Sequence, residues 1–119
     1  MDTPTVHKLK DEQSFNDFIA KNKFVAINFS SKRIRESILI NPTFTELSKE
    51  HPEIKFVQLD VDEMHEMHEI DNIAEIYKVS EIPTFRFLHD SESIDYDGVG
   101  GLTNCIKVFS QDIKYAPGA

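Results

Sequence analysis

Between residues 77 and 85 the chain reads Tyr77-Lys78-Val79-Ser80-Glu81-Ile82-Pro83-Thr84-Phe85. The proline separates a short helical segment from an apolar strand, because its ring removes a backbone donor and fixes φ. Two strands, 84–89 and 94–98, are expected to form a hairpin across the polar turn Asp90-Ser91-Glu92. This stretch therefore predicts a helix that leads into a pair of antiparallel strands.

Working outward, apolar runs alternate with segments of helical periodicity, which is typical of an α/β domain. The predicted strands are 6–9, 24–29, 54–61, 84–89 and 94–98, and the predicted helices are 11–22, 36–50, 73–79 and 102–113. Pro42 falls inside the second helix and is expected to kink it.

The strand at 24–29, the loop and helix after it, and the strand entry Ile82-Pro83-Thr84 together resemble the thioredoxin family. Leu59-Asp60-Val61-Asp62 and Gly100 before the last helix add to the resemblance. It implies a thioredoxin fold, with a central mixed sheet of about five strands flanked by about four helices. We expect one domain over 1–119, with a core at 6–113, an insert at 64–72 and a frayed tail at 114–119.

Composition narrows the classes of partner. The net charge of −8 argues against nucleic-acid binding and against attraction to an anionic membrane surface. The first residues contain no apolar signal segment, and the chain has one cysteine, so no intrachain disulfide is possible. These features predict a cytoplasmic or nuclear protein that is a monomer or a weak dimer.

The resemblance also identifies chemical positions that have changed. The family loop carries Trp-Cys-Gly-Pro-Cys, where this chain has Arg33 for the tryptophan and Ile34 and Ser37 for the two cysteines. The family's buried acid corresponds to Asn28. Disulfide exchange needs a thiolate and a resolving thiol. We therefore predict no catalytic residue, no cofactor and no oxidoreductase activity, so that the chain is not an enzyme.

A different nucleophile in this loop would be Ser37. It would need a histidine base within reach, and none of the histidines is expected near the loop: His7, His51, His65, His68 and His89. The alternative is a serine at a helix start that satisfies backbone donors, which we favour.

Binding is the function that the sequence predicts instead. Lys32, Arg33 and Arg35 place cations beside a helix start in an acidic protein, where an acidic or phosphorylated protein segment is expected to dock. The resemblance implies that the peptide bond before Pro83 is cis, and that the backbone beside this proline pairs with an extended peptide. The predicted binding residues, forming one shallow groove, are Lys32, Arg33, Ile34, Arg35, Ser37, Ile82, Pro83 and Thr84. The chain would then act as an adaptor or a chaperone-like module.

Two alternatives stay open. One is a glutathione-binding or transferase-type protein of the same fold. The other is a metal-responsive interaction domain that uses the insert, where His65, His68 and Glu69 have helical spacing but no fourth ligand, so no metal is assigned. Cys105, on the last helix, is expected to be a small buried hydrophobe.

Overall fold

The computed structural model describes residues 5–115, which form a central sheet with helices on both faces. The five strands are β1 (Val6–Leu9), β2 (Phe24–Ser30), β3 (Lys55–Asp60), β4 (Thr84–His89) and β5 (Glu92–Ile94). Their order in the sheet is β1-β3-β2-β4-β5. The pairs β1–β3 and β2–β3 are parallel, whereas β2–β4 and β4–β5 are antiparallel. The predicted mixed sheet of about five strands is confirmed.

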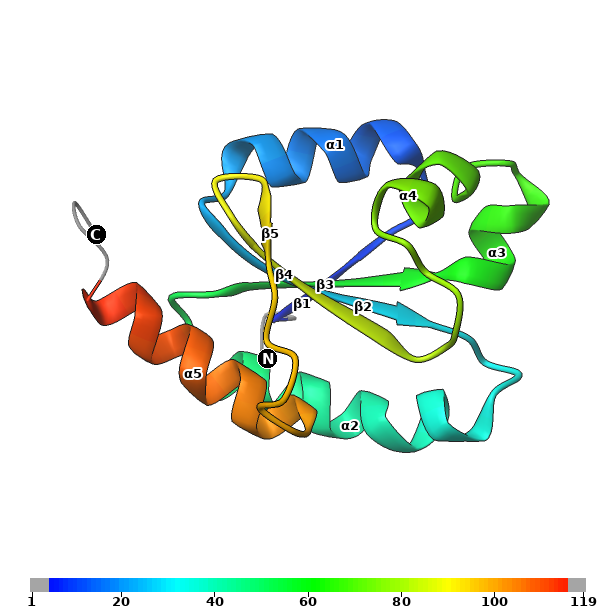
Figure 1. Cartoon of the computed structure of the whole chain (residues 1–119). Coiled ribbons are helices and arrows are strands. Elements are labelled where there is room, and N and C mark those ends of the chain that lie inside the picture. The colour runs from blue at the N-terminus through cyan, green and yellow to red at the C-terminus, as the bar shows by residue number, and fades with distance from the viewer. Residues whose placement is uncertain (1–4, 116–119) are drawn as a thin grey trace.

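The helices are α1 (Glu12–Lys21), α2 (Arg35–Glu50), α3 (Val61–Glu66), α4 (Asp71–Ile76) and α5 (Leu102–Tyr115). In Figure 1, α1, α3 and α4 lie on one side of the sheet, and α2 and α5 lie on the other. Within residues 5–115 there are five helices, where about four were expected, because the chain after β3 folds into two short helices. None of these helices has the length and apolarity that a membrane crossing requires.

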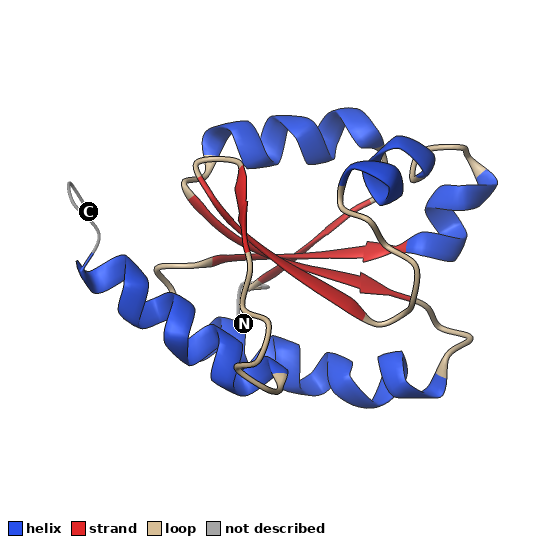
Figure 2. Cartoon of the chain, in the orientation of Figure 1, coloured by secondary structure: helices blue, strands red, loops and turns tan. Residues whose placement is uncertain are grey.

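Alternate residues of the strands supply two hydrophobic cores. Figure 2 shows the helices (blue) on both sides of the strands (red). Ile27 on β2 packs into the first core with Phe15 of α1 and Ile73 of α4. Ala26 packs into the second core with Phe44 of α2. Because successive side chains of a strand point to opposite faces, the nearly all-apolar β2 is buried on both faces.

One edge of the sheet collects the segments that the sequence singled out. The parallel strands β2 and β3 end side by side, with Ser30 opposite Asp60. The antiparallel strand β4 begins at the same edge, with Thr84 opposite Phe29. The loop before α2, the start of α3 and the Ile82–Pro83 segment therefore converge there.

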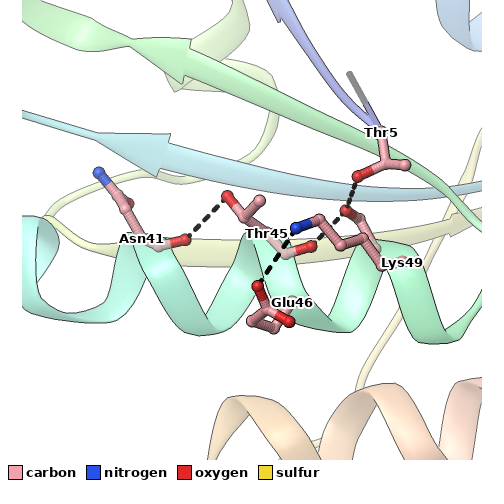
Figure 3. Close-up of polar contacts among 6 residues, drawn as sticks. Thr5, Asn41, Thr45, Glu46 and Lys49 are labelled. Carbon is pink, nitrogen blue, oxygen red and sulfur yellow. Dashed lines mark hydrogen bonds and ion pairs between the residues drawn. The ribbon is translucent and has the colours of Figure 1, made fainter. Parts of the chain in front are cut away.

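Helix α2 continues through Pro42. Figure 3 shows polar contacts along it: the hydroxyl of Thr45 donates to the carbonyl oxygen of Asn41 at 3.2 Å, and Lys49 pairs with Glu46 at 3.3 Å. The Ser48 hydroxyl donates to the Thr45 carbonyl oxygen and also contacts the hydroxyl of Thr5, which precedes β1. These contacts connect the C-terminal half of α2 to the start of the sheet.

Several boundaries differ from the prediction, among them those of the helix expected at 73–79, which is α4 (Asp71–Ile76). The hairpin turn consists of Asp90 and Ser91, both at positive φ, so β5 is Glu92–Ile94 and not 94–98. Asp95 ends the strand, because its carboxylate accepts the N–H of Asp97 at 2.8 Å. The predicted tail is wrong at its first two residues, which belong to α5, and 116–119 lie outside the described residues.

The short β5 leaves part of β4 without a neighbour. β5 pairs only with Phe87 to His89, so Thr84 to Arg86 have no strand on their outer side among the described residues. The Arg86 guanidinium lies there and donates to the carbonyl oxygens of Phe85 at 3.0 Å, Tyr77 at 2.9 Å and Lys78 at 3.3 Å. One side chain therefore takes the place of a strand partner and also joins β4 to the end of α4.

Candidate functional site

The loop between β2 and α2 is organised by Ser31. Its backbone N–H donates to the Ser37 hydroxyl at 3.0 Å. Its own hydroxyl donates to the Asp62 carboxylate and accepts the N–H of Arg33 at 3.1 Å. Both serines are buried. The loop is therefore fixed by hydrogen bonds within the residues that form it and to the first turn of α3.

Ser37 has the structural role that the sequence favoured, although the donor is a loop N–H and not a helical one. Its fully buried side chain cannot touch a partner, so its place among the predicted binding residues is wrong. The helix itself begins at Arg35, with Ile34 at the N-cap and no side-chain cap.

Asn28, at the position of the family's acid, is fully buried on β2. Its amide nitrogen donates to the Asn41 side-chain oxygen on α2 at 2.9 Å. Its own oxygen is the one buried side-chain polar atom without a partner among the described residues. A neutral amide thus occupies this position, and it leaves an acceptor unpaired in a dry environment.

Ile34 and Ile82 line the same cavity, which has a volume of about 620 Å³. The other lining residues are Val61, Asp62, His65, Ile70, Ala74, Val79, Ser80 and Glu81. We call this cavity the Ile34–Ile82 groove. The structure thus brings together the two predicted segments, 32–37 and 82–84, through these two isoleucines. The groove is mainly apolar, and Asp62 and Glu81 place acidic groups on its α3 and β4 sides.

The three cations lie beside the groove and not within it. Lys32, Arg33 and Arg35 are exposed, and none forms an ion pair with another residue of the described range. Pro83 and Thr84 are half-buried and also lie outside the groove lining. Of the eight predicted binding residues, Ile34 and Ile82 line the groove, and the three cations adjoin Ile34 in the sequence.

The backbone of Ile82 is unpaired. The peptide bond to Pro83 is cis, as the resemblance implied. Neither the N–H nor the C=O of Ile82 forms a hydrogen bond with another residue between 5 and 115, whereas Thr84 begins the paired strand. The Thr84 hydroxyl donates to the carbonyl oxygen of Glu81 and holds the turn before the strand.

His65 contradicts the prediction that no histidine lies near the loop. It lines the same groove as Ile34, because α3 starts directly at the end of β3 and turns back over the sheet edge. Its Nδ1 lies 3.4 Å from the carboxylate of Asp71, and His68 lies 3.7 Å from the other oxygen of that carboxylate. The buried Ser37 hydroxyl is nevertheless engaged by Ser31.

The insert does not gather the three predicted metal candidates. Glu69 turns away from His65 and His68, and its carboxylate accepts the backbone N–H of Glu12 at 2.9 Å. Among residues 5–115, no group of three or more His, Cys, Asp and Glu side chains is arranged to hold a metal ion.

Cys105 lies on α5, away from the loop, and packs partly buried against the second core. Burial raises the pKa of its thiol above the ordinary value. It also lines a second cavity of about 870 Å³, which runs along the open part of β4 between α4 and α5. The expected small hydrophobe is therefore only partly buried.

Sequence reasoning missed Ser31 and Asp62, which fix the loop, and Val79 and Ala74, which line the groove. Asp62 carried a signal, because it directly follows a parallel strand that ends at the same edge as β2. The contact of Ser31 with Asp62 carried none, since it joins residues 31 positions apart.

A five-stranded mixed sheet in this order, with helices on both faces and a cis proline at the entry to β4, defines a thioredoxin-fold protein. The family model described as Thioredoxin matches residues 5–110. The chain belongs to the thioredoxin family.

Relatives agree with this assignment. Thioredoxin-2 of Pyricularia oryzae is 34% identical over 91 residues, which cover 76% of this chain and 50% of that protein. Thioredoxin of Geodia cydonium is 32% identical over 94 residues, covering 76% of this chain and 83% of its own. The crystal structure of oxidised mitochondrial thioredoxin 3 from Saccharomyces cerevisiae matches with a TM-score of 0.65 and 28% identity, over 76% of this chain and 79% of that one.

The chain spans about half the length of the first two relatives that it matches, 50% and 57%.

The names of the relatives contradict the prediction that the chain is not an enzyme. Thioredoxins are dithiol–disulfide oxidoreductases, so family membership points to enzymatic activity. The prediction relied on four substituted positions, Asn28, Arg33, Ile34 and Ser37, whereas the match extends over most of the chain. Because the chain has one cysteine, Cys105 is the thiol available to any thiol chemistry.

Proposed function

We propose that the Ile34–Ile82 groove binds an extended protein segment of acidic or phosphorylated character, and that the chain acts as an adaptor or a chaperone-like module through this groove. The observation that carries the proposal is the unpaired backbone of Ile82. An unpaired N–H and C=O beside a strand entry can add a further extended segment by backbone hydrogen bonds, and such pairing gives affinity that depends little on sequence.

The groove beside this backbone supports the same reading. Its apolar side chains, among them Ile34, Ala74 and Val79, offer contact area to the segment's side chains. The loop that carries Ile34 is fixed through Ser31 and Asp62, so little conformational entropy is lost when a segment binds.

The charges around the groove set the orientation of the bound segment. Lys32, Arg33 and Arg35 stand free on one side of the groove, in a protein whose net charge is −8. Asp62 and Glu81 stand on the other sides. A bound segment therefore places its acidic or phosphorylated residues toward the arginines and keeps them away from the two acids, because unlike charges attract and like charges repel at this range.

The experiment titrates the protein with a labelled extended peptide that carries a run of aspartates after a short apolar stretch. Two matched peptides test the backbone pairing and the charge attraction separately. One has the same sequence with N-methylated backbone amides, and the other has lysines in place of the aspartates. We expect binding to weaken about tenfold or more with each change, since each removes a set of direct contacts.

Matched protein variants localise the charge effect. Arg33→Glu with Arg35→Glu should weaken binding of the acidic peptide about tenfold, whereas Lys55→Glu with Lys107→Glu changes the net charge equally at a distance and should have little effect. Equal affinity for the N-methylated peptide, or for the lysine peptide, would overturn the proposal.

A further inference from the structure

Ile38 and Leu39 form an exposed apolar pair at the start of α2. They are 51% and 64% exposed, although both are large aliphatic side chains on a well-formed helix. Other large apolar side chains that are more than half exposed in the described range, Met67, Ile76 and Tyr115, do not adjoin one another in sequence. Single exposed apolar residues are common on proteins, whereas contiguous apolar surface with a polar border is typical of an interaction site.

The exposed residues around this pair follow helical spacing. Arg35 is exposed one turn before Leu39, and Pro42 is exposed one turn after Ile38, so these four residues follow one stripe along the helix. We call them the α2 stripe: Arg35, Ile38, Leu39 and Pro42. Helix α5 covers α2 farther along, where Phe44 and Leu47 share the second core with Ile106 and Phe109. In Figure 1 the N-terminal half of α2 extends beyond α5.

Cations flank the apolar pair at its N-terminal end. Lys32, Arg33 and Arg35 have no ion-pair partner among residues 5–115, and Glu36 is the single acidic residue in the first turn of α2. The remaining charge of the molecule is strongly negative. The local surface is therefore complementary to a partner that is both apolar and acidic.

We propose that the α2 stripe is a second docking surface, which takes an acidic amphipathic helix of a partner protein. A stripe with i, i+3 and i+4 spacing presents a ridge that fits between the ridges of another helix. Apolar residues of the partner helix cover Ile38 and Leu39, and glutamates along their border meet Arg35 and the loop cations. This surface goes beyond the Ile34–Ile82 groove, because it uses the outer face of α2 and no backbone pairing.

The test is an NMR titration of the isotope-labelled chain with three synthetic helical peptides. The first carries leucines in one stripe bordered by glutamates, the second has alanines in place of the leucines, and the third has lysines in place of the glutamates. We expect the first peptide to shift the amide signals of residues 35–42, and the other two to bind at least about tenfold more weakly.

Protein variants separate this surface from other exposed apolar residues. Ile38→Gln with Leu39→Gln keeps good helix formers at exposed positions and should weaken binding of the first peptide about tenfold. Met67→Gln with Ile76→Gln removes two side chains of similar exposure, 70% and 68%, and should leave the affinity unchanged. Arg35→Glu should weaken binding and reduce its dependence on salt.

Several outcomes would overturn the inference: an unchanged affinity in the Ile38 and Leu39 variant, tighter binding of the lysine peptide, or signal shifts confined to residues outside 32–42. Retention on phosphatidylserine vesicles without peptide binding would assign the surface to membranes. Concentration-dependent self-association that the variant abolishes would assign it to a second copy. The groove proposal is tested by the extended peptide and is unaffected by these results.

Discussion

The carboxylate of Glu69 lies 2.9 Å from the backbone nitrogen of Glu12, the first residue of α1. The N–H groups of a first helical turn have no partner inside the helix, and an acceptor there also interacts favourably with the helix dipole. Asp11 caps the same helix through the N–H of Ser14 at 2.7 Å. Glu69 therefore supplies a second cap from a residue 57 positions away, and it joins the insert to α1.

Replacing Glu69 with alanine should lower the free energy of unfolding by about 1–2 kcal/mol, because a charged acceptor of a helix-start N–H is lost. Glu69→Gln keeps an acceptor and should lose less. Urea unfolding followed by circular dichroism measures both, with Glu66→Ala as the control, since Glu66 is exposed at the end of α3. Equal losses in Glu66→Ala and Glu69→Ala would show that the cap contributes nothing.

Asn28→Asp should make stability depend on pH. The position is fully buried, and its polar neighbour there, the Asn41 side-chain oxygen, is an acceptor that cannot stabilise a carboxylate. Burial therefore raises the pKa of an introduced carboxyl group in the folded state. An unfolded aspartate ionises near about pH 3.9. The folded state then holds a proton that the unfolded state releases, so stability falls as pH rises from there up to the raised folded pKa.

At neutral pH the expected loss is about 2–4 kcal/mol relative to the original chain, and it should nearly vanish in acid. Asn16→Asp, at an exposed position of α1, is the matched control. Chemical denaturation across the pH range measures both variants. A loss that does not change with pH would mean that the carboxylate gains water or a cation at this site.

Glu53 should stabilise the folded chain with a pH dependence opposite to that of the Asn28→Asp variant. Burial opposes ionisation, but hydrogen bonds from its own backbone N–H and from the Ser110 hydroxyl at 2.8 Å, together with nearby His51, lower the pKa of this carboxyl below 4.5. A lowered folded pKa gives stability that is present above pH 4.5 and is lost as pH falls through the folded value.

The variant Glu53→Gln should therefore be less stable than the original chain above pH 4.5, and the difference should shrink in acid. Thermal unfolding at a series of pH values measures it. Glu50→Gln, at the exposed end of α2, should show no such convergence. A constant difference between Glu53→Gln and the original chain would contradict the assigned pKa shift.

Thiol chemistry in this chain should depend on Cys105 alone. Its partial burial raises the pKa of the thiol, so we expect alkylation by iodoacetamide at neutral pH to be about tenfold slower than that of a free cysteine. Any reduction of insulin disulfides by the chain should be lost in Cys105→Ser, because no other thiol is present. Turnover that persists in a folded Cys105→Ser protein would require a mechanism without sulfur.

Much of the fold could be predicted, because the apolar patterns of several segments are compatible with one arrangement only. A run as apolar as Val25 to Phe29 needs cover on both faces, and Ile106, Phe109 and Ile113 needed one buried helix face, which the structure confirms. The turn of the hairpin could be predicted less well. The choice between a turn of two residues and one of three depends on whether Asp90 and Ser91 adopt positive φ, and either residue tolerates both conformations.

The sequence predicted those parts of the candidate site that the order of strands and helices places, and it did not predict contacts between individual side chains. Ile34 and Ile82 were placed together because the fold brings a loop and a strand entry to one edge. The position of His65 depends on the direction in which α3 leaves β3, which the Asp60 cap fixes through the N–H of Glu63 at 3.0 Å. The burial of Ser37 depends on a contact with Ser31 that no periodicity encodes.

The Arg86 guanidinium has a consequence for the behaviour of the protein in concentrated solution. An unpaired strand edge is a template onto which other chains can assemble into fibres. Between Thr84 and Arg86 the edge of β4 is open, and the guanidinium occupies the Phe85 carbonyl oxygen that an incoming strand would need. A strand that paired here would have to displace this permanently charged group and break its hydrogen bonds to the carbonyl oxygens of Tyr77, Lys78 and Phe85. We therefore expect Arg86 to protect the shortened hairpin against aggregation.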